Sequence, residues 1–394
     1  MSSLMNNYSR QNLTLVKGEG AWLFDAAGNR YLDALSGVAV CGLGHCHPAV
    51  TKAMQEQAAT LVHTSNIFHV AAQEKLADTL VRLSGLTNAF FNNSGAEANE
   101  TAIKLARLYG HKKGINSPAI IVMDNSFHGR TLATLTATGN RKIQAGFEPL
   151  VQGFIRAPYN DLDAIRNIAH NTNDVVALLV EPVQGEGGIR IPDAHYLSAL
   201  RKICDEHDWL LMLDEIQTSV CRTGKWFAFQ HSDCKPDVMT LAKNLANGVP
   251  IGACLAGDKA ADLFKPGNHG STFGGNPFAC AVASAALAVY ETGNLAERSA
   301  MLGKFIVEQL QASLQNVEGV VEVRGIGMMI GIELDRPCGN LVKEAIDRGL
   351  LINVTADKVI RLLPPMTLSD AEAGQLITIL SALVKDFLAQ QSAA

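Results

Sequence analysis

Residues 209–217, WLLMLDEIQ, are an apolar run that ends in Asp214 and Glu215. A second apolar run, in residues 239–244, MTLAKN, ends at Lys243, which lies 29 positions after Asp214. Short apolar runs bounded by polar residues are typical of the buried strands of a parallel sheet. We therefore expect Asp214 and Lys243 to lie at the carboxyl ends of two strands, the edge at which open parallel sheets bind their ligands.

The same pattern extends on both sides of these runs. From about Ala89 to Leu255, short apolar runs alternate with amphipathic stretches, which predicts an α/β fold with a mostly parallel central sheet in a large domain. The expected strands are residues 89–91, 120–123, 175–180, 210–213 and 238–241. Residues 26–29 predict a hairpin turn, and residues 48–61 a helix. From about Leu295 the order helix, strands, helix predicts a smaller α+β domain.

Composition excludes several classes of protein. The 394 residues are 47% hydrophobic and 18% charged, which is enough to bury a large core. The formal net charge is −5 without a basic stripe, so we expect no nucleic-acid partner. The first twenty residues do not read as a secretory signal, and no apolar stretch reaches bilayer length, so we expect a cytoplasmic chain with no membrane contact.

The cysteines and histidines do not predict a metal site. The eight cysteines are scattered without a CxxC pair, which fits free thiols in a reducing compartment. The segment His45-Cys46-His47 has metal-ligand residue types, but no carboxylate lies near it in the sequence. Such a segment more often packs or caps a helix, so we expect no bound metal.

Lys243 and Asp214 together suit pyridoxal 5′-phosphate (PLP) chemistry. A PLP enzyme needs a lysine that forms a Schiff base with the cofactor and a carboxylate that keeps the ring nitrogen protonated. Taken alone, each residue has a plainer interpretation, because an Asp after a strand is often a turn or cap and a Lys is often a solvated surface charge. Their placement on two expected strand ends favours the cofactor interpretation.

Three further positions fit such a site. Gly95 and Ala96 follow a strand and open a helix, whose N-terminal N–H groups suit a phosphate, although Ser94 followed by acidic residues also fits an ordinary N-cap. Phe127 suits stacking on a planar ring, although many Phe residues are simply core. Arg130 offers a bidentate fork for a carboxylate, although many Arg residues lie on the surface.

Seven blocks, in order, resemble those of the class III PLP-dependent aminotransferases. They are SGAEANE (94–100), FHGR (127–130), EPVQGEGG (181–188), DEIQ (214–217), LAKN (241–244), HGSTFGGNP (269–277) and RLLPP (361–365). The resemblance covers the chain from about residue 18 to 365 and implies PLP-dependent transferase fold type I and a homodimer with shared active sites. Residues 61–294 would form the large PLP-binding domain and residues 295–394 the small domain, with residues 1–60 contributing to the small domain.

The resemblance also implies the role of each matching residue. The cofactor contacts would be Gly95 and Ala96 to the phosphate, Phe127 on the ring face, Asp214 to the ring nitrogen, Gln217 to the ring oxygen, Lys243 as the Schiff-base lysine and proton shuttle, and Thr272 to the phosphate of the neighbouring subunit's cofactor. Ser271 would lie beside the substrate. Arg361 would bind the α-carboxylate of glutamate and Arg130 the remaining carboxylate. Glu186 would neutralise Arg361 and swing away when glutamate binds.

Two further blocks, LSGVAVCGLGHCHP (35–48) and HTSNIF (63–68), resemble the acetylornithine aminotransferases of this family. Ornithine aminotransferases place a tyrosine where this chain has Val38, which implies more room here for an acylated amine. We therefore expect N2-acetyl-L-ornithine and 2-oxoglutarate to give N-acetyl-L-glutamate 5-semialdehyde and L-glutamate, a step of arginine biosynthesis.

Other substrates and classes stay open. The acetyl and succinyl forms share every block quoted, so the acyl group stays open. Succinylornithine, succinyl-diaminopimelate, ornithine and 4-aminobutyrate are the alternative amino donors. A PLP racemase would have no use for two carboxylate anchors, and a non-catalytic regulatory homologue would be expected to have lost Lys243 or Asp214. Two loops also depart from the family pattern: residues 219–224, SVCRTG, replace GxGRTG, and residues 243–248, KNLANG, replace KGLGGG. Lost glycines predict altered or stiffer loops.

Overall fold

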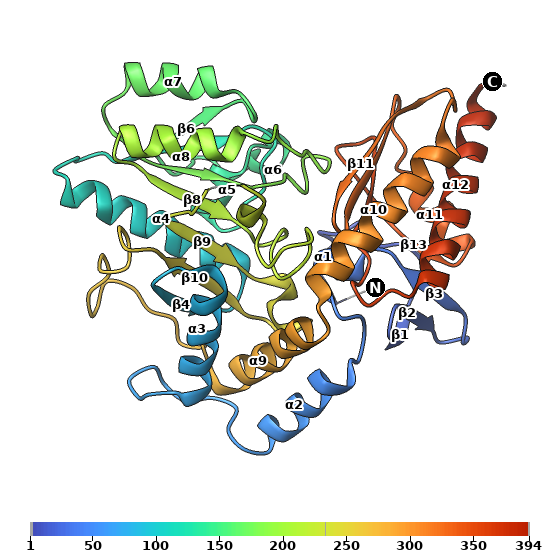
Figure 1. Cartoon of the computed structure of the whole chain (residues 1–394), viewed down its shortest axis with the longest axis horizontal. Helices are drawn as coiled ribbons and strands as arrows, with labels where there is room; N and C mark the ends of the chain where they lie inside the picture. The colour runs from blue at the N-terminus through green and yellow to red at the C-terminus, as the bar shows by residue number, and fades with distance from the viewer. Residues whose placement is uncertain (1–2, 233, 393–394) are drawn as a thin grey trace.

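A seven-stranded sheet forms the centre of the larger part of the molecule (Figure 1). The computed structural model describes residues 3–232 and 234–392. The strands are β4 (Asn88–Asn92), β5 (Ala119–Met123), β6 (Phe154–Ala157), β7 (Val175–Val180), β8 (Leu210–Asp214), β9 (Val238–Leu241) and β10 (Gly252–Ala256). Their order is β4-β10-β9-β8-β7-β5-β6, and only β10 runs antiparallel to its neighbours among these strands.

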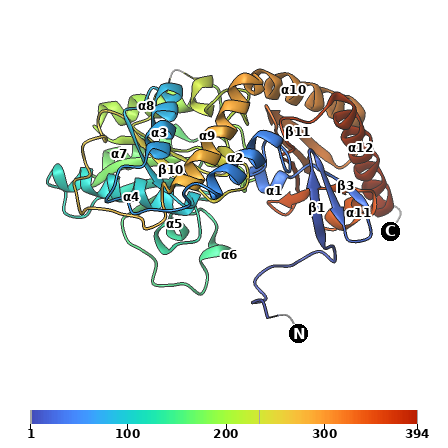
Figure 2. The ribbon, with the colours of Figure 1, turned by 90° about the horizontal axis from the view of Figure 1, so that it is seen from below.

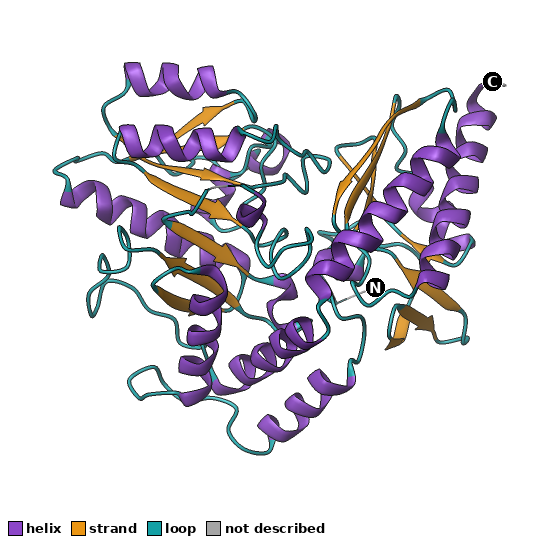
Figure 3. Cartoon of the chain, in the orientation of Figure 1, coloured by secondary structure: helices purple, strands orange, loops and turns teal. Residues whose placement is uncertain are grey.

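Helices cover both faces of this sheet (Figure 3). They are α3 (Ala71–Ser84), α4 (Gly95–Lys112), α5 (Leu132–Ala137), α6 (Arg141–Gln144), α7 (Leu162–Asn171), α8 (Tyr196–Glu206) and α9 (Pro277–Thr292). Successive residues of β8 point to opposite faces of the sheet. Leu211 packs in one core cluster with Leu200 of α8, and Met212 packs in the other with Ala102 of α4. A strand buried on both faces is expected to be apolar throughout, as β5 and β7 are.

The smaller part contains two four-stranded sheets (Figure 2). One is β11 (Val320–Ile326), β12 (Met329–Leu334), β15 (Val359–Leu362) and β14 (Asn353–Thr355), flanked by α10 (Leu295–Leu314), α11 (Leu341–Asp347) and α12 (Asp370–Ser392). The other is β1 (Leu15–Glu19), β2 (Trp22–Asp25), β3 (Arg30–Asp33) and β13 (Leu350–Leu351). Because β13 pairs with β3, the two ends of the chain share one sheet.

Two elements, α1 (Ser36–Ala39) and α2 (Pro48–Ala58), lie between β3 and the first helix of the larger part. The 3-10 turns η1 (Ala228–His231) and η2 (Lys243–Ala246) lie within the larger part, after β8 and β9 respectively. Helix α2 packs against α9 of the larger part, although it follows directly on β1–β3 in the sequence. The predicted domain boundaries at residues 60 and 294 stay a prediction.

The predicted fold class is confirmed: a mostly parallel sheet in a large part, with a smaller α+β part. The sequence analysis did not foresee β6 and β10, nor the short strands β13 to β15. Within residues 3–232 and 234–392, no single helix is long and apolar enough to cross a membrane, although α9 and α10 taken together pass a length and composition test with a 65° bend between them.

Candidate active site

A cavity of about 470 Å³ opens where the parallel strands of the large sheet end. Residues that directly follow β4, β5, β7, β8 and β9 line it, as expected for an open parallel sheet. The predicted site residues in this lining are Gly95, Ala96, Phe127, Arg130, Glu186, Asp214, Gln217 and Lys243. The fold therefore brings together residues that lie up to 148 positions apart in the sequence, from Gly95 to Lys243.

Lys243 directly follows β9 and opens the turn η2. Its φ of +47° is unusual for a residue with a Cβ and costs about 1 kcal/mol or more. Desolvation by the surrounding protein, and secondarily the positive charge of Arg361, lower the pKa of Lys243 to about 8. A substantial fraction of this amine is therefore uncharged near neutral pH, which is the form that attacks a carbonyl carbon.

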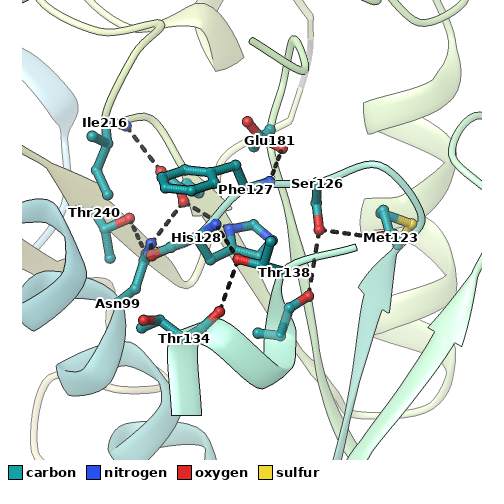
Figure 4. Close-up of polar contacts among 12 residues, drawn as sticks. Asn99, Met123, Ser126, Phe127, His128, Thr134, Thr138, Glu181, Ile216 and Thr240 are labelled. Carbon is teal, nitrogen blue, oxygen red and sulfur yellow. Dashed lines mark hydrogen bonds and ion pairs between the residues drawn. The ribbon is translucent and has the colours of Figure 1, made fainter. Parts of the chain in front are cut away.

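Asp214 ends β8, and three N–H groups hold its carboxylate (Figure 4). Its Oδ2 accepts from His128 Nδ1 at 2.7 Å and from Asn99 Nδ2 at 2.7 Å. Its Oδ1 accepts from the backbone N–H of Ile216 at 3.1 Å. These hydrogen bonds fix the orientation of a buried carboxylate about the cavity wall.

A second carboxyl group, Glu181, follows β7 and lines the same cavity. It accepts hydrogen bonds from the backbone N–H groups of Phe127 at 3.1 Å and Gly185 at 3.4 Å. Burial, and then the negative charge of Asp214, raise the pKa of Glu181 well above its ordinary value. The environment therefore favours the protonated form of Glu181.

The start of α4 presents its N-terminus to the cavity. Ser94 is the N-cap and accepts from the backbone N–H of Glu97 at 3.2 Å, so the predicted N-cap is present together with the predicted helix. Gly95 and Ala96 follow in the first turn, where backbone N–H groups have no intrahelical acceptor. A Cβ on Gly95 would lie 2.8 Å from Ile216 Cδ1, so glycine allows the helix to begin close to the residues after β8.

Two arginines and a glutamate form the charged part of the site. Arg361, on β15, is 1% exposed, and its Nη1 lies 2.7 Å from Glu186 Oε1. Burial is the largest single influence and would raise the pKa of Glu186, but the charge and hydrogen bond of Arg361, together with the charges of Lys243 and Arg130, outweigh burial and lower this pKa. Arg130 is exposed and lies with its guanidinium carbon 5.7 Å from the centre of the Phe127 ring. It also lines an adjoining cavity of about 970 Å³.

Ser271 and Thr272 lie elsewhere in the chain's own structure. They line a separate cavity of about 340 Å³, which shares Asn93 with the main cavity. Ser271 Oγ accepts from Asn93 Nδ2 at 3.2 Å and from the backbone N–H of Gly274 at 2.9 Å. Neither residue is therefore brought to Lys243 within this chain.

The histidine segment differs from what we expected. His45 Nε2 lies 2.8 Å from Asp33 Oδ2, so this histidine does have a carboxylate partner, supplied by β3. The hydrogen bond to Asp33 is the main cause that raises the pKa of His45 to about 10. Across the described part of the chain, no group of three or more His, Cys, Asp or Glu side chains is placed to hold a metal ion.

A family model for class III aminotransferases matches residues 4–384. The chain belongs to the class III aminotransferases. This membership confirms the predicted family and enzyme class, and it confirms PLP as the cofactor.

Named relatives extend the comparison. The aminotransferase is 61% identical over 388 residues to acetylornithine aminotransferase of Nitrosomonas europaea, which covers 98% of this chain and 99% of the relative. It is 54% identical over 390 residues to acetylornithine aminotransferase 1 of Bordetella pertussis, with 99% of each chain covered. The solved structure of ornithine aminotransferase from Toxoplasma gondii ME49 matches with a TM-score of 0.95 at 35% identity, covering 100% of this chain and 94% of that one.

The cavity of this aminotransferase fits PLP by its own chemistry. It offers an amine with a lowered pKa, a fixed carboxylate and a helix N-terminus for a phosphate. Gln217 lines the cavity with its Oε1 buried and without a hydrogen-bond partner among the described residues, which suits a polar ring substituent. Gly185 lies directly against the side chain of Gln217: a Cβ at position 185 would lie 2.0 Å from Gln217 Oε1, so only glycine leaves room for this side chain.

Several residues of the site were missed by the sequence analysis. His128 and Asn99 lie in the blocks FHGR and SGAEANE but were given no role, and Glu181 follows a strand that was predicted. Thr240 lies within β9 and donates to Asn99 Oδ1 at 2.8 Å. Nothing in the sequence marks Thr240, because its partner comes from a helix 141 positions away.

The two loops that depart from the family pattern do need unusual backbone angles. Cys221 has a φ of +67° and Asn247 a φ of +48°, and each stands where the expected family pattern has glycine. Asparagine tolerates this conformation better than most residues. The Asn247 side chain also accepts from the backbone N–H of Leu43 at 2.9 Å and donates to Gly44 O at 3.0 Å. This loop of the aminotransferase is therefore fixed by side-chain hydrogen bonds.

Proposed function

We propose that this aminotransferase moves the terminal amino group of N2-acetyl-L-ornithine to 2-oxoglutarate, giving N-acetyl-L-glutamate 5-semialdehyde and L-glutamate, a step of arginine biosynthesis. The observation that carries the proposal is that Arg130 and Glu186 line one cavity, and that Arg361, which does not itself line it, is paired with Glu186. Arg130 has no ion-pair partner among the described residues, whereas Arg361 is paired with Glu186. This arrangement suits a donor and an acceptor that differ by one carboxylate near the reacting carbon.

The cofactor contacts predicted from the sequence are part of this proposal. PLP, when bound, supplies an aldehyde and an electron-accepting ring. The Lys243 amine would hold it covalently and afterwards carry the proton between substrate and cofactor carbons. Asp214 would face the ring nitrogen, Gln217 the ring oxygen and Phe127 the ring face. Gly95 and Ala96 would donate to the phosphate.

The ion pair gives a physical account of how one site accepts two substrates. A donor that reacts through its terminal amine carries its carboxylate at the far end, where Arg130 would bind it, while Arg361 remains paired with Glu186. Glutamate places a carboxylate next to the reacting carbon and would take the place of Glu186 on Arg361. Glu186 lies in a Gly-rich loop with a side chain 38% exposed, so it can move, whereas Arg361 is 1% exposed.

The acyl group is supported by the relatives named above and less directly by the cavity. Val40 and Val183 line the cavity, and Val38 packs against the cluster that contains Val183 without lining the cavity itself. A tyrosine at position 38 would therefore affect the bound donor in one of two ways: indirectly, by displacing residues that line the cavity, or directly, by extending its side chain into the cavity. The small apolar wall suits an uncharged acetamide better than a free ammonium group.

We also propose a homodimer in which Ser271 and Thr272 serve the partner's site. Both lie outside the chain's own main cavity, so they are available to a second copy. Apolar side chains are exposed close by: Ile67 is 80% exposed, Phe68 64% and Phe273 62%. The two segments are tied together, because Asn66 Nδ2 donates to the carbonyl oxygens at positions 271 and 274. A large exposed apolar patch is typical of an interface.

A cytoplasmic location fits this function. All eight cysteines are free thiols, and six of them are buried, as is usual where glutathione and thioredoxin keep thiols reduced. The location remains part of the proposal.

Steady-state kinetics with a panel of donors tests the function. The purified holoenzyme is assayed with 2-oxoglutarate and N2-acetylornithine, N2-succinylornithine, ornithine or 4-aminobutyrate. We expect the highest kcat/KM with N2-acetylornithine. A higher kcat/KM with free ornithine would favour the activity that the Toxoplasma gondii structure is named for, since the fold alone does not distinguish the two. Turnover with none of the four donors would instead favour a non-catalytic protein.

A further inference from the structure

His128 is a buried residue next to the charged carboxylate of the site. Its side chain has no exposed surface, and its Nδ1 lies 2.7 Å from Asp214 Oδ2. It comes from the loop after β5, whereas Asp214 comes from the end of β8. The contact therefore joins two separate strand ends in the wall of the cavity, which both residues line, and Figure 4 shows the residues around it.

The hydrogen bonds around His128 determine which atoms donate. Thr240 Oγ1 donates to Asn99 Oδ1 at 2.8 Å, which leaves the Asn99 Nδ2 group to donate to Asp214 Oδ2 at 2.7 Å and to the carbonyl oxygen of His128 at 2.8 Å. An ionised carboxylate only accepts. His128 Nδ1 must therefore carry a proton.

The other nitrogen of the ring has no such partner. His128 Nε2 is buried and has no hydrogen-bond partner among residues 3–232 and 234–392. A proton on Nε2, in addition to the one on Nδ1, would make the ring charged and would bury an N–H without an acceptor. Burying that charged ring costs more free energy than burying an Nε2 lone pair without a donor. The hydrogen bonds favour the tautomer with its hydrogen on Nδ1.

We infer that His128 is a positioning residue: with its hydrogen on Nδ1, it and Asn99 occupy both lone pairs of Asp214 Oδ2 and leave Oδ1 as the oxygen that faces the cofactor. Oδ1 has one described donor, the Ile216 N–H at 3.1 Å, so one of its lone pairs remains for the ring nitrogen. The inference rests on the proposed contact between Asp214 and that nitrogen. It adds a reason for the histidine beside Phe127.

The same dipeptide sets the position of the stacking ring. The backbone N–H of Phe127 donates to Glu181 Oε2 at 3.1 Å, and that of His128 donates to Thr138 Oγ1 at 2.9 Å. Because Phe127 and His128 are adjacent, anchoring His128 to Asp214 also fixes the Phe127 ring relative to that carboxylate. One side chain thus aligns the two groups that would contact the ring face and the ring nitrogen.

Two variants at one position separate the hydrogen bond from packing. His128→Leu removes the donor and puts an apolar side chain of similar size in the place of the imidazole. His128→Asn keeps an N–H donor near the position of Nδ1. Ser126→Ala is a matched control, because Ser126 is buried on the same loop and donates to Met123 O at 2.7 Å without touching Asp214. Each apo-protein is titrated with PLP to give a dissociation constant, and each holoenzyme is assayed for kcat and KM.

We expect His128→Leu to weaken PLP binding about tenfold to a hundredfold, the effect of losing one hydrogen bond to a charged group, and to lower kcat more than it changes the KM for N2-acetylornithine. His128→Asn should recover most of both losses, and Ser126→Ala should leave both constants near the parent values. In the parent apo-protein, nitrogen NMR should show one protonated nitrogen, Nδ1, in the His128 ring.

Three results would overturn the inference: parent-like PLP affinity and kcat in His128→Leu, losses in His128→Asn equal to those in His128→Leu, or a His128 ring protonated on Nε2. Asp214→Asn distinguishes these failures from a failure of the proposed site. If Asp214→Asn also leaves PLP binding unchanged, the proposed role of Asp214 is wrong, and if only Asp214→Asn weakens it, the role of His128 alone is wrong.

Discussion

Arg361 Nη1 lies 2.7 Å from Glu186 Oε1, and the two partners differ greatly in burial. The Arg361 side chain is 1% exposed and is held by a second hydrogen bond from its Nε to Asn353 Oδ1 at 3.0 Å. The Glu186 side chain is 38% exposed and pairs only through its Oε1 in the described structure. The arginine is therefore the fixed partner, and an incoming carboxylate competes with the glutamate for it.

Replacing Glu186 by Gln should shift preference between the two amino donors. The neutral amide no longer competes for Arg361, so we expect the KM for glutamate to fall about tenfold, while kcat/KM for N2-acetylornithine falls because a buried guanidinium is left unpaired. Single-turnover half-reactions with each donor measure the two effects separately. Equal changes for both donors would contradict competition for Arg361.

Replacing Arg130 by Lys should weaken the binding of both substrates. A lysine cannot reproduce the bidentate fork, so we expect kcat/KM to fall about tenfold to a hundredfold for N2-acetylornithine and for 2-oxoglutarate, mainly through KM. Arg141→Lys is the matched control, because Arg141 lines the adjoining cavity but not the main one. If Arg130→Lys has a parent-like KM for both substrates, the proposed carboxylate anchor is elsewhere.

The lowered pKa of Lys243 predicts how the stability of the apo-protein depends on pH. The pKa of Lys243 is about 8 in the folded protein, against an ordinary lysine value of 10.5, so between these values the unfolded chain binds a proton that the folded chain does not. The free energy of unfolding should therefore rise with pH across this window, by up to about 3 kcal/mol. Lys243→Met has no amine to deprotonate on folding, so its free energy of unfolding should exceed that of the parent most below about pH 8. The difference should shrink toward about pH 10.

Urea denaturation of both apo-proteins at about pH 7 and about pH 10 measures this difference. The signal is the change in the gap between the two proteins, because other groups titrate equally in both. A gap that is the same at both pH values would mean that Lys243 is not desolvated in the folded protein.

Charging the exposed apolar patch should dissociate the proposed dimer. Ile67→Glu with Phe273→Glu places two carboxylates where apolar side chains would be buried against the partner, a position in which unpaired charge is costly. Analytical ultracentrifugation should show a dimer for the parent and a monomer for the double variant, with weaker PLP retention. The patch is not the interface if the double variant sediments as the parent does.

The sequence specified the large sheet well where strands are buried on both faces. Runs such as Val175–Val180 are apolar throughout, and their polar ends marked the site residues Asp214 and Lys243. β10, Gly252–Ala256, was missed because GACLA is short and rich in small residues, and β6 was missed because FIRA contains an arginine at the sheet edge. Both segments become strands because each pairs with a neighbouring strand, and that pairing depends on the fold and not on the local sequence.

The site was predictable in its residues and less so in its contacts. Gly95, Asp214 and Lys243 stand in motif blocks whose order is visible in the sequence. The contact between His128 and Asp214 spans 86 positions, and that between Thr240 and Asn99 spans 141. No local pattern encodes such distances, since they arise only when the strands take their order in the sheet.

Identifying the lysine that carries the cofactor tests the central claim most directly. The purified holoenzyme is treated with borohydride, which fixes PLP to the amine that holds it, and is then digested and analysed by mass spectrometry. We expect the cofactor mass on the peptide that contains Lys243 and on no other peptide. Cofactor attached to a different lysine, or absent from every peptide of a fully active holoenzyme, would contradict the proposed active site.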